Sequence, residues 1–203
     1  MRGLYAITDA GLQPADELAE RVVQAIEGGA ALIQYRDKSD RRLLRRAQAG
    51  ELAIICEQRG VPLIINDDVG LAAEVGAAGV HLGRDDGDPA AARRLLGEGA
   101  LIGVSCYADW QRAVDAARAG TDYIAFGRFF PSRTKPHTEQ AELDLLRRAK
   151  RELGLHVVAI GGITPDNGAT LLEAGADMLA VVHGVFGAAD VATAARQYAA
   201  LFR

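Results

Sequence analysis

The sequence of 203 residues lacks any apolar run approaching the ~20 residues that a membrane-spanning helix needs. Its start, Met1–Asp9, reaches an acidic residue too early for a secretory signal peptide. It also lacks a basic stripe, since arginines and acidic residues are interspersed and the net charge is −4. Nucleic acid is therefore not an expected partner. These absences predict a soluble, cytoplasmic protein with neither a membrane nor a nucleic-acid partner.

Cysteine, lysine and serine are also scarce. The two cysteines, Cys56 and Cys106, are far apart and lack CxxC spacing, which excludes a disulfide framework and a zinc site. Only three lysines and three serines occur. Serine is common in loops in general. Because lysine and serine are otherwise rare in this chain, the few that occur indicate a functional role at their positions. They are Lys38, Lys135, Lys150, Ser39, Ser105 and Ser132.

Short apolar runs alternate with longer segments of helical period, and we find no linker within residues 1–203, so we expect one domain. Nearly continuous apolar strands are typical of a parallel sheet covered by helices. The expected strands are Leu4–Thr8, Leu32–Tyr35, Leu63–Ile65, Gly79–Leu82, Leu101–Val104, Tyr123–Phe126, Val157–Ile160 and Met178–Val182. The expected helices include Ala15–Glu27, Arg41–Glu57, Pro89–Leu96, Trp110–Ala119, Leu143–Leu153, Pro165–Glu173 and Ala188–Leu201.

Eight such units predict an α/β fold of the (β/α)8 TIM-barrel type, although the chain is short for it. The alternative is a doubly wound open sheet. That fold usually carries a glycine-rich loop after its first strand, and Ala6–Asp9 is not one.

In a barrel of this type the site lies at the carboxyl ends of the strands. The polar residues there are of mixed charge: Arg36, Lys38 and Lys135 are basic, whereas Asp67 and Asp86 are acidic. Carboxylates beside basic residues make sense if Mg2+ links them to a substrate phosphate, since Mg2+ commonly binds one or two carboxylates plus phosphate oxygens. The pair Gly161–Gly162 suits a second phosphate, bound by backbone N–H groups. The ends of the strands therefore predict two phosphate-bearing ligands.

Seven motifs in order resemble the thiamine-phosphate synthase family along essentially the whole chain. They are GLYAITD, QYRDK, PLIINDD, GVHLG with a following aspartate, IGVS, FFPSRTK and VAIGGITPDN, before a closing strand segment. The resemblance implies a TIM-barrel transferase that joins an aminopyrimidine diphosphate to a thiazole phosphate and releases pyrophosphate. It implies a dissociative substitution, in which binding residues stabilise the leaving group and Mg2+ assists.

The resemblance also implies roles for individual residues. Asp67 and Asp86 would bind Mg2+, and Arg36, Lys38 and Lys135 would stabilise the leaving group. The implied substrate-binding residues are Gln34, Tyr35, Arg36, Asp37, Lys38, Asn66, Ser105, Ser132, Arg133, Thr134, Lys135, Gly162, Val182 and His183. Within the extended segment Gln34–Lys38, alternation would turn Tyr35 and Asp37 away from the site.

Four positions depart from the family pattern: Arg84 replaces a glutamine, Tyr107 a histidine, Ser132 a threonine and His183 a serine. The change at His183 removes a hydroxyl, so a side-chain contact to the thiazole phosphate would be lost there and a backbone contact would remain.

Some nearby polar residues have simpler explanations. Asp68 is expected to cap a helix, and His81 falls within an apolar strand and is expected in the core. Three other functions remain open: a thiazole phosphate tautomerase of the related barrel family, a Schiff-base lyase or aldolase using Lys135, and a non-catalytic thiamine-pathway binding protein.

Overall fold

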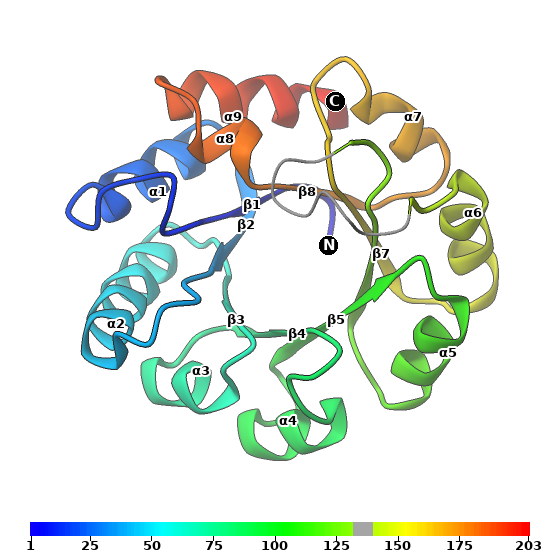
Figure 1. The fold of residues 1–203 in the computed structure, drawn as a ribbon, viewed down its shortest axis with the longest axis horizontal. Coiled ribbons are helices and arrows are strands. Elements are labelled where there is room, and N and C mark those ends of the chain that lie inside the picture. The colour runs from blue at the N-terminus through cyan, green and yellow to red at the C-terminus, as the bar shows by residue number, and fades with distance from the viewer. Residues whose placement is uncertain (132–139) are drawn as a thin grey trace.

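Eight parallel strands follow one another around a closed barrel, and helices surround it (Figure 1). The structure is a computed structural model that describes residues 1–131 and 140–203. The first strand pairs with both the second and the eighth, which closes the barrel. The strands are β1 (Gly3–Ile7), β2 (Ala30–Tyr35), β3 (Leu63–Asn66), β4 (Gly79–Leu82), β5 (Leu101–Tyr107), β6 (Tyr123–Phe126), β7 (His156–Ile160) and β8 (Met178–Val181).

Helices connect successive strands on the outside of the barrel (Figure 1). They are α1 (Leu18–Glu27), α2 (Arg42–Gln58), α3 (Val69–Val75), α4 (Pro89–Leu96), α5 (Trp110–Arg118), α6 (Leu143–Glu152) and α7 (Gly168–Glu173). After β8 come the short α8 (His183–Phe186), then α9 (Val191–Ala199) and a 3-10 turn, η1 (Ala200–Phe202). No helix in the described ranges is long and apolar enough to cross a membrane.

The core has two layers because successive side chains of a strand point to opposite faces. On β1, Leu4 and Ala6 pack outward among the helices, while Tyr5 and Ile7 pack inside the barrel. Both faces of the strands are therefore covered, which explains why they read as continuous apolar runs. The two cysteines, Cys56 and Cys106, are buried free thiols.

The closed barrel confirms the expected fold and excludes the open sheet. Two strands and one helix have the expected bounds, namely β4, β6 and α4. The expected start of the helix at Pro165 was wrong. Helix α7 starts at Gly168, and in the turn before it the Asn167 side chain accepts a hydrogen bond from Thr164 N at 2.8 Å.

Candidate active site

A cavity of about 320 Å³ opens at the carboxyl ends of the strands. This volume lies in the range of small-molecule sites. The cavity brings together side chains from opposite sides of the barrel, as expected for a site built at strand ends. The expected site residues that line it are Gln34, Arg36, Asn66, Ser105, Gly162, Val182 and His183.

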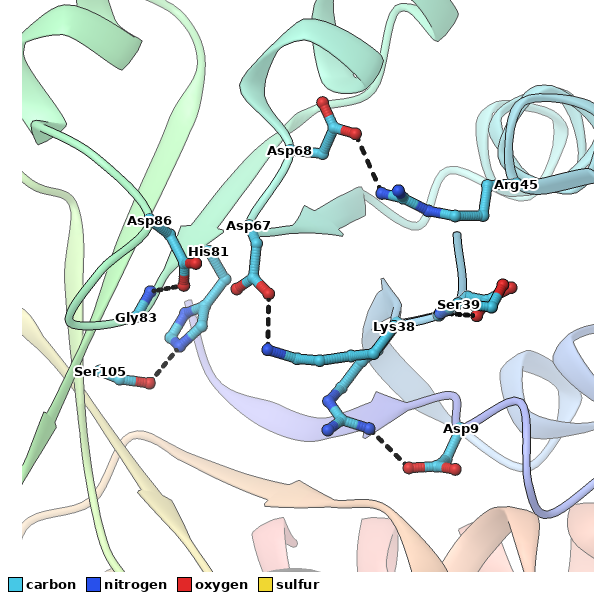
Figure 2. Close-up of polar contacts among 12 residues, drawn as sticks. Asp9, Lys38, Ser39, Arg45, Asp67, Asp68, His81, Gly83, Asp86 and Ser105 are labelled. Atoms are coloured by element: carbon cyan, nitrogen blue, oxygen red, sulfur yellow. Dashed lines mark hydrogen bonds and ion pairs between the residues drawn. The ribbon is translucent and has the colours of Figure 1, made fainter. Parts of the chain in front are cut away.

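An acidic and basic cluster lies beside this cavity, after β2, β3 and β4. Lys38 Nζ is 2.9 Å from Asp67 Oδ2, and Figure 2 shows Asp86 on the other side of Asp67. Asp86 Oδ2 accepts a hydrogen bond from Gly83 N at 2.8 Å. The two carboxylates expected to bind Mg2+ are thus neighbours, and a lysine contacts one of them.

The position of Asp67 depends on an unusual backbone conformation. Its φ is +65°, in the left-handed region that Asp and Asn adopt more readily than most residues. The Asp67 N–H donates to the carbonyl of His81 on β4 at 2.9 Å, which fixes the turn against the neighbouring strand. Such conformations cost about 1–3 kcal/mol and are concentrated at functional sites.

The neighbouring carboxylates affect each other's charge. Burial, a hydrogen bond with Asp67 and the negative charge of Asp67 raise the pKa of Asp86, whereas the Gly83 N–H and the Lys38 ammonium lower it. The net direction is upward, which shows that the site disfavours a second negative charge. A divalent cation between the two carboxylates would remove this repulsion, so the donor set suits Mg2+.

Arg36 is held in place at the cavity wall. Its Nη1 is 2.6 Å from Asp9 Oδ2, and its backbone N–H donates to Thr8 Oγ1 at 2.9 Å. Both partners follow β1, so the first two strand ends together position this guanidinium. A fixed guanidinium is well suited to a phosphate group.

Tyr35 and Asp37 face away from the cavity, which confirms the alternation inferred for this segment. The Tyr35 hydroxyl donates to Gln48 Oε1 on α2 at 2.9 Å, and Asp37 Oδ1 accepts from Ser39 N at 2.8 Å. Neither side chain lines the cavity, so the structure gives no contact that would support the substrate-binding role implied for them.

Asp68 caps α3, as expected, by accepting a hydrogen bond from Leu71 N at 2.9 Å. Its other oxygen contacts Arg45 Nη2 at 2.9 Å (Figure 2). These two interactions direct its carboxylate away from the Asp67 and Asp86 pair.

His81 was expected in the core, and it is indeed buried, but it also lines the cavity. Its Nε2 is 2.9 Å from Ser105 Oγ (Figure 2). The signal was present in the sequence, because Val80 and Leu82 pack outward and alternation then places His81 inside the barrel.

The opposite side of the cavity combines glycine backbone with side chains that include Arg128, which follows β6. Gly161 and Gly162 have φ values of +102° and +68°. A Cβ on Gly162 would lie 2.3 Å from the carbonyl oxygen of Pro131, so no side chain fits there. The short helix α8 begins at His183, and the first N–H groups of a helix lack acceptors within it. The sequence did not predict α8, because four residues are too few to show a helical period.

Two of the departures from the family pattern contact each other. The Arg84 guanidinium lies 5.1 Å from the centre of the Tyr107 ring, a cation–π contact at the cavity margin. His183 is exposed and lines the cavity at the start of α8. Ser132, Arg133, Thr134 and Lys135 lie outside the described residues.

Comparison with known proteins identifies the family. The model of the TMP-TENI family, described as thiamine monophosphate synthase, matches residues 4–185. A thiamine-phosphate synthase of Nitrosococcus oceani is 54% identical over 198 residues, covering 98% of this chain and 91% of the relative. That of Azoarcus sp. is 55% identical over 202 residues, covering 100% and 98%.

A solved structure agrees. Thiamine phosphate pyrophosphorylase from Pyrococcus furiosus superposes with a TM-score of 0.88 at 33% identity, covering 98% of this chain and 95% of that one. The match extends over the whole barrel, so it includes every strand end that forms the cavity. The chain belongs to the thiamine monophosphate synthase family.

Proposed function

We propose that the protein condenses 4-amino-2-methyl-5-hydroxymethylpyrimidine diphosphate with 4-methyl-5-(2-phosphooxyethyl)thiazole to give thiamine phosphate and pyrophosphate. The observation that carries this proposal is the division of one cavity into a charged side and a backbone side. Two phosphate-bearing substrates need two such sites, and the family assignment supports the same reaction.

The pyrimidine diphosphate would bind on the charged side. Arg36 and Lys38 would neutralise the diphosphate, and the amides of Gln34 and Asn66 would orient the pyrimidine. Arg36, Gln34 and Asn66 line the cavity, and Lys38, two residues after Arg36, contacts Asp67. Asp9 contacts Arg36 and Asp67 contacts Lys38, so these acidic partners help to position the two cations.

Mg2+ would be held by Asp67 and Asp86. Two carboxylates are a donor set through which Mg2+ commonly binds beside a substrate phosphate. When bound, the ion supplies positive charge to the diphosphate. The pKa of Asp86 is raised first by burial and then by its contacts with Asp67, and a nearby cation would favour the charged form of both carboxylates.

The thiazole phosphate would bind on the backbone side, at Gly162 and at the amides of Val182 and His183. Close approach to Gly162 is possible because it carries no side chain. By resemblance, Ser132, Arg133 and Thr134 would line this phosphate pocket, and Lys135 would contact the pyrophosphate.

The reaction breaks the bond between the pyrimidine methylene carbon and the diphosphate oxygen, whose electron pair leaves with pyrophosphate. The thiazole nitrogen then gives its lone pair to that carbon. In a dissociative substitution of this kind, negative charge grows on the leaving group. Fixed cations such as Arg36 and Lys38 stabilise that charge without having to reorganise, and the cavity aligns the two reactants.

The test is to incubate the purified protein with both substrates and Mg2+ and to measure thiamine phosphate by its oxidation to fluorescent thiochrome. We expect product that depends on both substrates and disappears with EDTA. Tight binding without pyrophosphate release would instead support the binding-protein alternative. Isomerisation of the thiazole phosphate alone would support the tautomerase. Trapping of a carbonyl substrate by borohydride would support the Schiff-base enzyme.

We also place the reaction in the cytoplasm. Cys56 and Cys106 are buried free thiols, the state that a reducing compartment maintains. Export of the active protein to an oxidising compartment would contradict this location.

A further inference from the structure

A continuous series of hydrogen bonds crosses the inside of the barrel beneath the cavity. Gln34 Nε2 is 2.5 Å from the Tyr5 hydroxyl, which is 2.9 Å from the Tyr123 hydroxyl. Tyr123 is 3.1 Å from His81 Nδ1, and His81 Nε2 is 2.9 Å from Ser105 Oγ. Each of the five side chains comes from a different strand, so the barrel itself fixes their spacing. We call this series the barrel relay.

Packing fixes the orientation of the rings in the barrel relay. Tyr5, Tyr123 and His81 are all buried. The Tyr123 ring lies against Gly103, where a Cβ would come within 1.9 Å of it. The His81 ring stacks on Tyr123 with centroids 5.6 Å apart and planes at 23°. Tyr5 meets Tyr123 edge-on, at 6.0 Å and 80°. These rings therefore cannot turn to other partners without disrupting the core.

The barrel relay has a preferred hydrogen-bond direction, because each tyrosine hydroxyl carries one hydrogen. The Gln34 amide donates to Tyr5, so the Tyr5 hydrogen needs another acceptor. Within the described part of the chain, Tyr123 is the other partner of Tyr5. Tyr123 then donates to His81 Nδ1. The opposite direction would leave the Tyr5 hydrogen buried without an acceptor, which is unfavourable.

This direction determines the tautomer of His81. If Nδ1 accepts from Tyr123, a neutral imidazole carries its hydrogen on Nε2 and donates it to Ser105 Oγ. Ser105 lines the cavity, and its own hydrogen then points toward a bound ligand. Burial raises the pKa of both Tyr5 and Tyr123, so these hydroxyls keep their hydrogens at neutral pH.

We propose that Tyr123 and His81 are positioning residues that make the Ser105 hydroxyl a hydrogen-bond donor to the substrate. The identity of that substrate rests on the proposed function. The pyrimidine diphosphate offers acceptors of two kinds, ring nitrogens and phosphate oxygens. A donor at Ser105 strengthens as negative charge grows on the leaving diphosphate, whereas a hydroxyl turned back toward His81 would not contribute in this way.

The first test is nitrogen NMR of protein labelled with ¹⁵N-histidine, at about pH 8, above the ordinary histidine pKa of ~6.5. His81→Asn identifies the His81 signals among the four histidines of the sequence. We expect the Nε2–H tautomer in the wild type and in Tyr5→Phe, which keeps the Tyr123 donor. Tyr123→Phe keeps the stacked ring but removes that donor, and we expect it to populate both tautomers.

An Nδ1–H tautomer of His81 in the wild type would overturn the proposed direction. A His81 tautomer that stays unchanged in Tyr123→Phe would also contradict it. Since neither signal depends on turnover, these outcomes are independent of the proposed reaction.

The second test is a double-mutant cycle on kcat in the thiochrome assay. Tyr123→Phe should lower kcat about tenfold when Ser105 is present and change it less than about twofold in Ser105→Ala, because coupled residues are non-additive. Equal effects of Tyr123→Phe in both backgrounds would show that it acts through general destabilisation instead. A wild-type protein that makes no thiamine phosphate would refute the proposed function, and the NMR result would still decide the direction of the barrel relay.

Discussion

The two sides of the cavity differ in which part of the protein faces the ligand. After β2, β3 and β4 the rim presents charged side chains, including Arg36, Lys38 and Asp67. After β7 and β8 it presents glycine backbone and the start of a short helix. Ligand binding on the charged side should depend on the identity of each side chain. Ligand binding on the backbone side should instead depend on glycine positions that carry no side chain. Substitutions can test this difference directly.

The largest expected effect is on the charged side, from Asp67→Asn. Asparagine also tolerates the left-handed backbone at this position, so the change removes the charge with little strain. We expect kcat to fall about 100- to 1,000-fold, measured as Mg2+-dependent thiamine phosphate formation. The matched control is Asp85→Asn, an exposed neighbour of Asp86. A rate within a few-fold of wild type in Asp67→Asn would remove Asp67 from the metal site.

On the backbone side, Gly162→Ala should also damage the site. A Cβ there would approach the carbonyl oxygens of Pro131 at 2.3 Å and Phe130 at 2.7 Å. We expect the KM for the thiazole phosphate to rise about tenfold or more and stability to fall by about 1–3 kcal/mol.

Gly154→Ala separates two effects of Gly162→Ala, the strain of a positive φ and the clash of the added Cβ with neighbouring carbonyl oxygens. Gly154 has nearly the same φ, +67°, but open space around its Cβ position and a place at the end of α6. It should therefore show the backbone strain without the change in KM. An equal rise in KM in both variants would mean that Gly162 does not contact the phosphate.

The acidic pair gives a pH-dependent prediction for the metal-free protein. Because folding raises the pKa of Asp86, its stabilising contribution is present below the unfolded-state pKa of ~3.9 and is lost as pH rises through the folded-state value. In Asp86→Asn the side chain at this position is uncharged at every pH. The Tm of this variant should equal that of wild type near pH 4 and exceed it at about pH 7.5, by on the order of 1–2 °C after solvent screening.

Added Mg2+ provides the check on this prediction. It should raise the Tm of the wild type at about pH 7.5 and leave Asp86→Asn nearly unchanged, because ligands that bind the folded state stabilise it. If metal-free Asp86→Asn has a lower Tm than metal-free wild type at about pH 7.5, the charge of Asp86 does not destabilise the folded protein.

The smallest effect is expected from His183→Ala. His183 is exposed, so the phosphate contact proposed there uses the backbone N–H and should survive loss of the ring. We expect the KM for the thiazole phosphate to change by less than about threefold. A substitution of the neighbouring Gly184 should disturb the site more than His183→Ala, because a Cβ on Gly184 would lie 2.1 Å from the Tyr198 hydroxyl. A large KM increase in His183→Ala would mean that the ring itself binds the phosphate.

The sequence predicted the barrel well because its signals are local. Apolar runs, helical periods and turn residues recur in each unit, so the bounds of β4, β6 and α4 agree with the structure. The charged residues of the site were also predictable, since each directly follows a strand. Helix α8 was missed because it is too short for a period, and Tyr35 could be excluded from the cavity only by alternation.

The barrel relay could not be predicted in this way. Tyr5, Tyr123 and His81 each look like core residues within their own strands. Their polar ends meet only when the barrel closes, and no local spacing encodes a contact between residues 118 apart, such as Tyr5 and Tyr123. Gly103 carried an indirect signal, since a small residue on a buried strand indicates close approach by another group.

The most direct test of the difference between the two sides is calorimetry with each ligand alone, in Mg2+ and in EDTA. We expect EDTA to abolish or strongly weaken binding of inorganic pyrophosphate, a probe of the charged side. Binding of the thiazole phosphate should be the same in both buffers. Metal-independent pyrophosphate binding, or thiazole phosphate binding that requires the metal, would contradict the assignment of a metal-bridged side and a backbone side to this cavity.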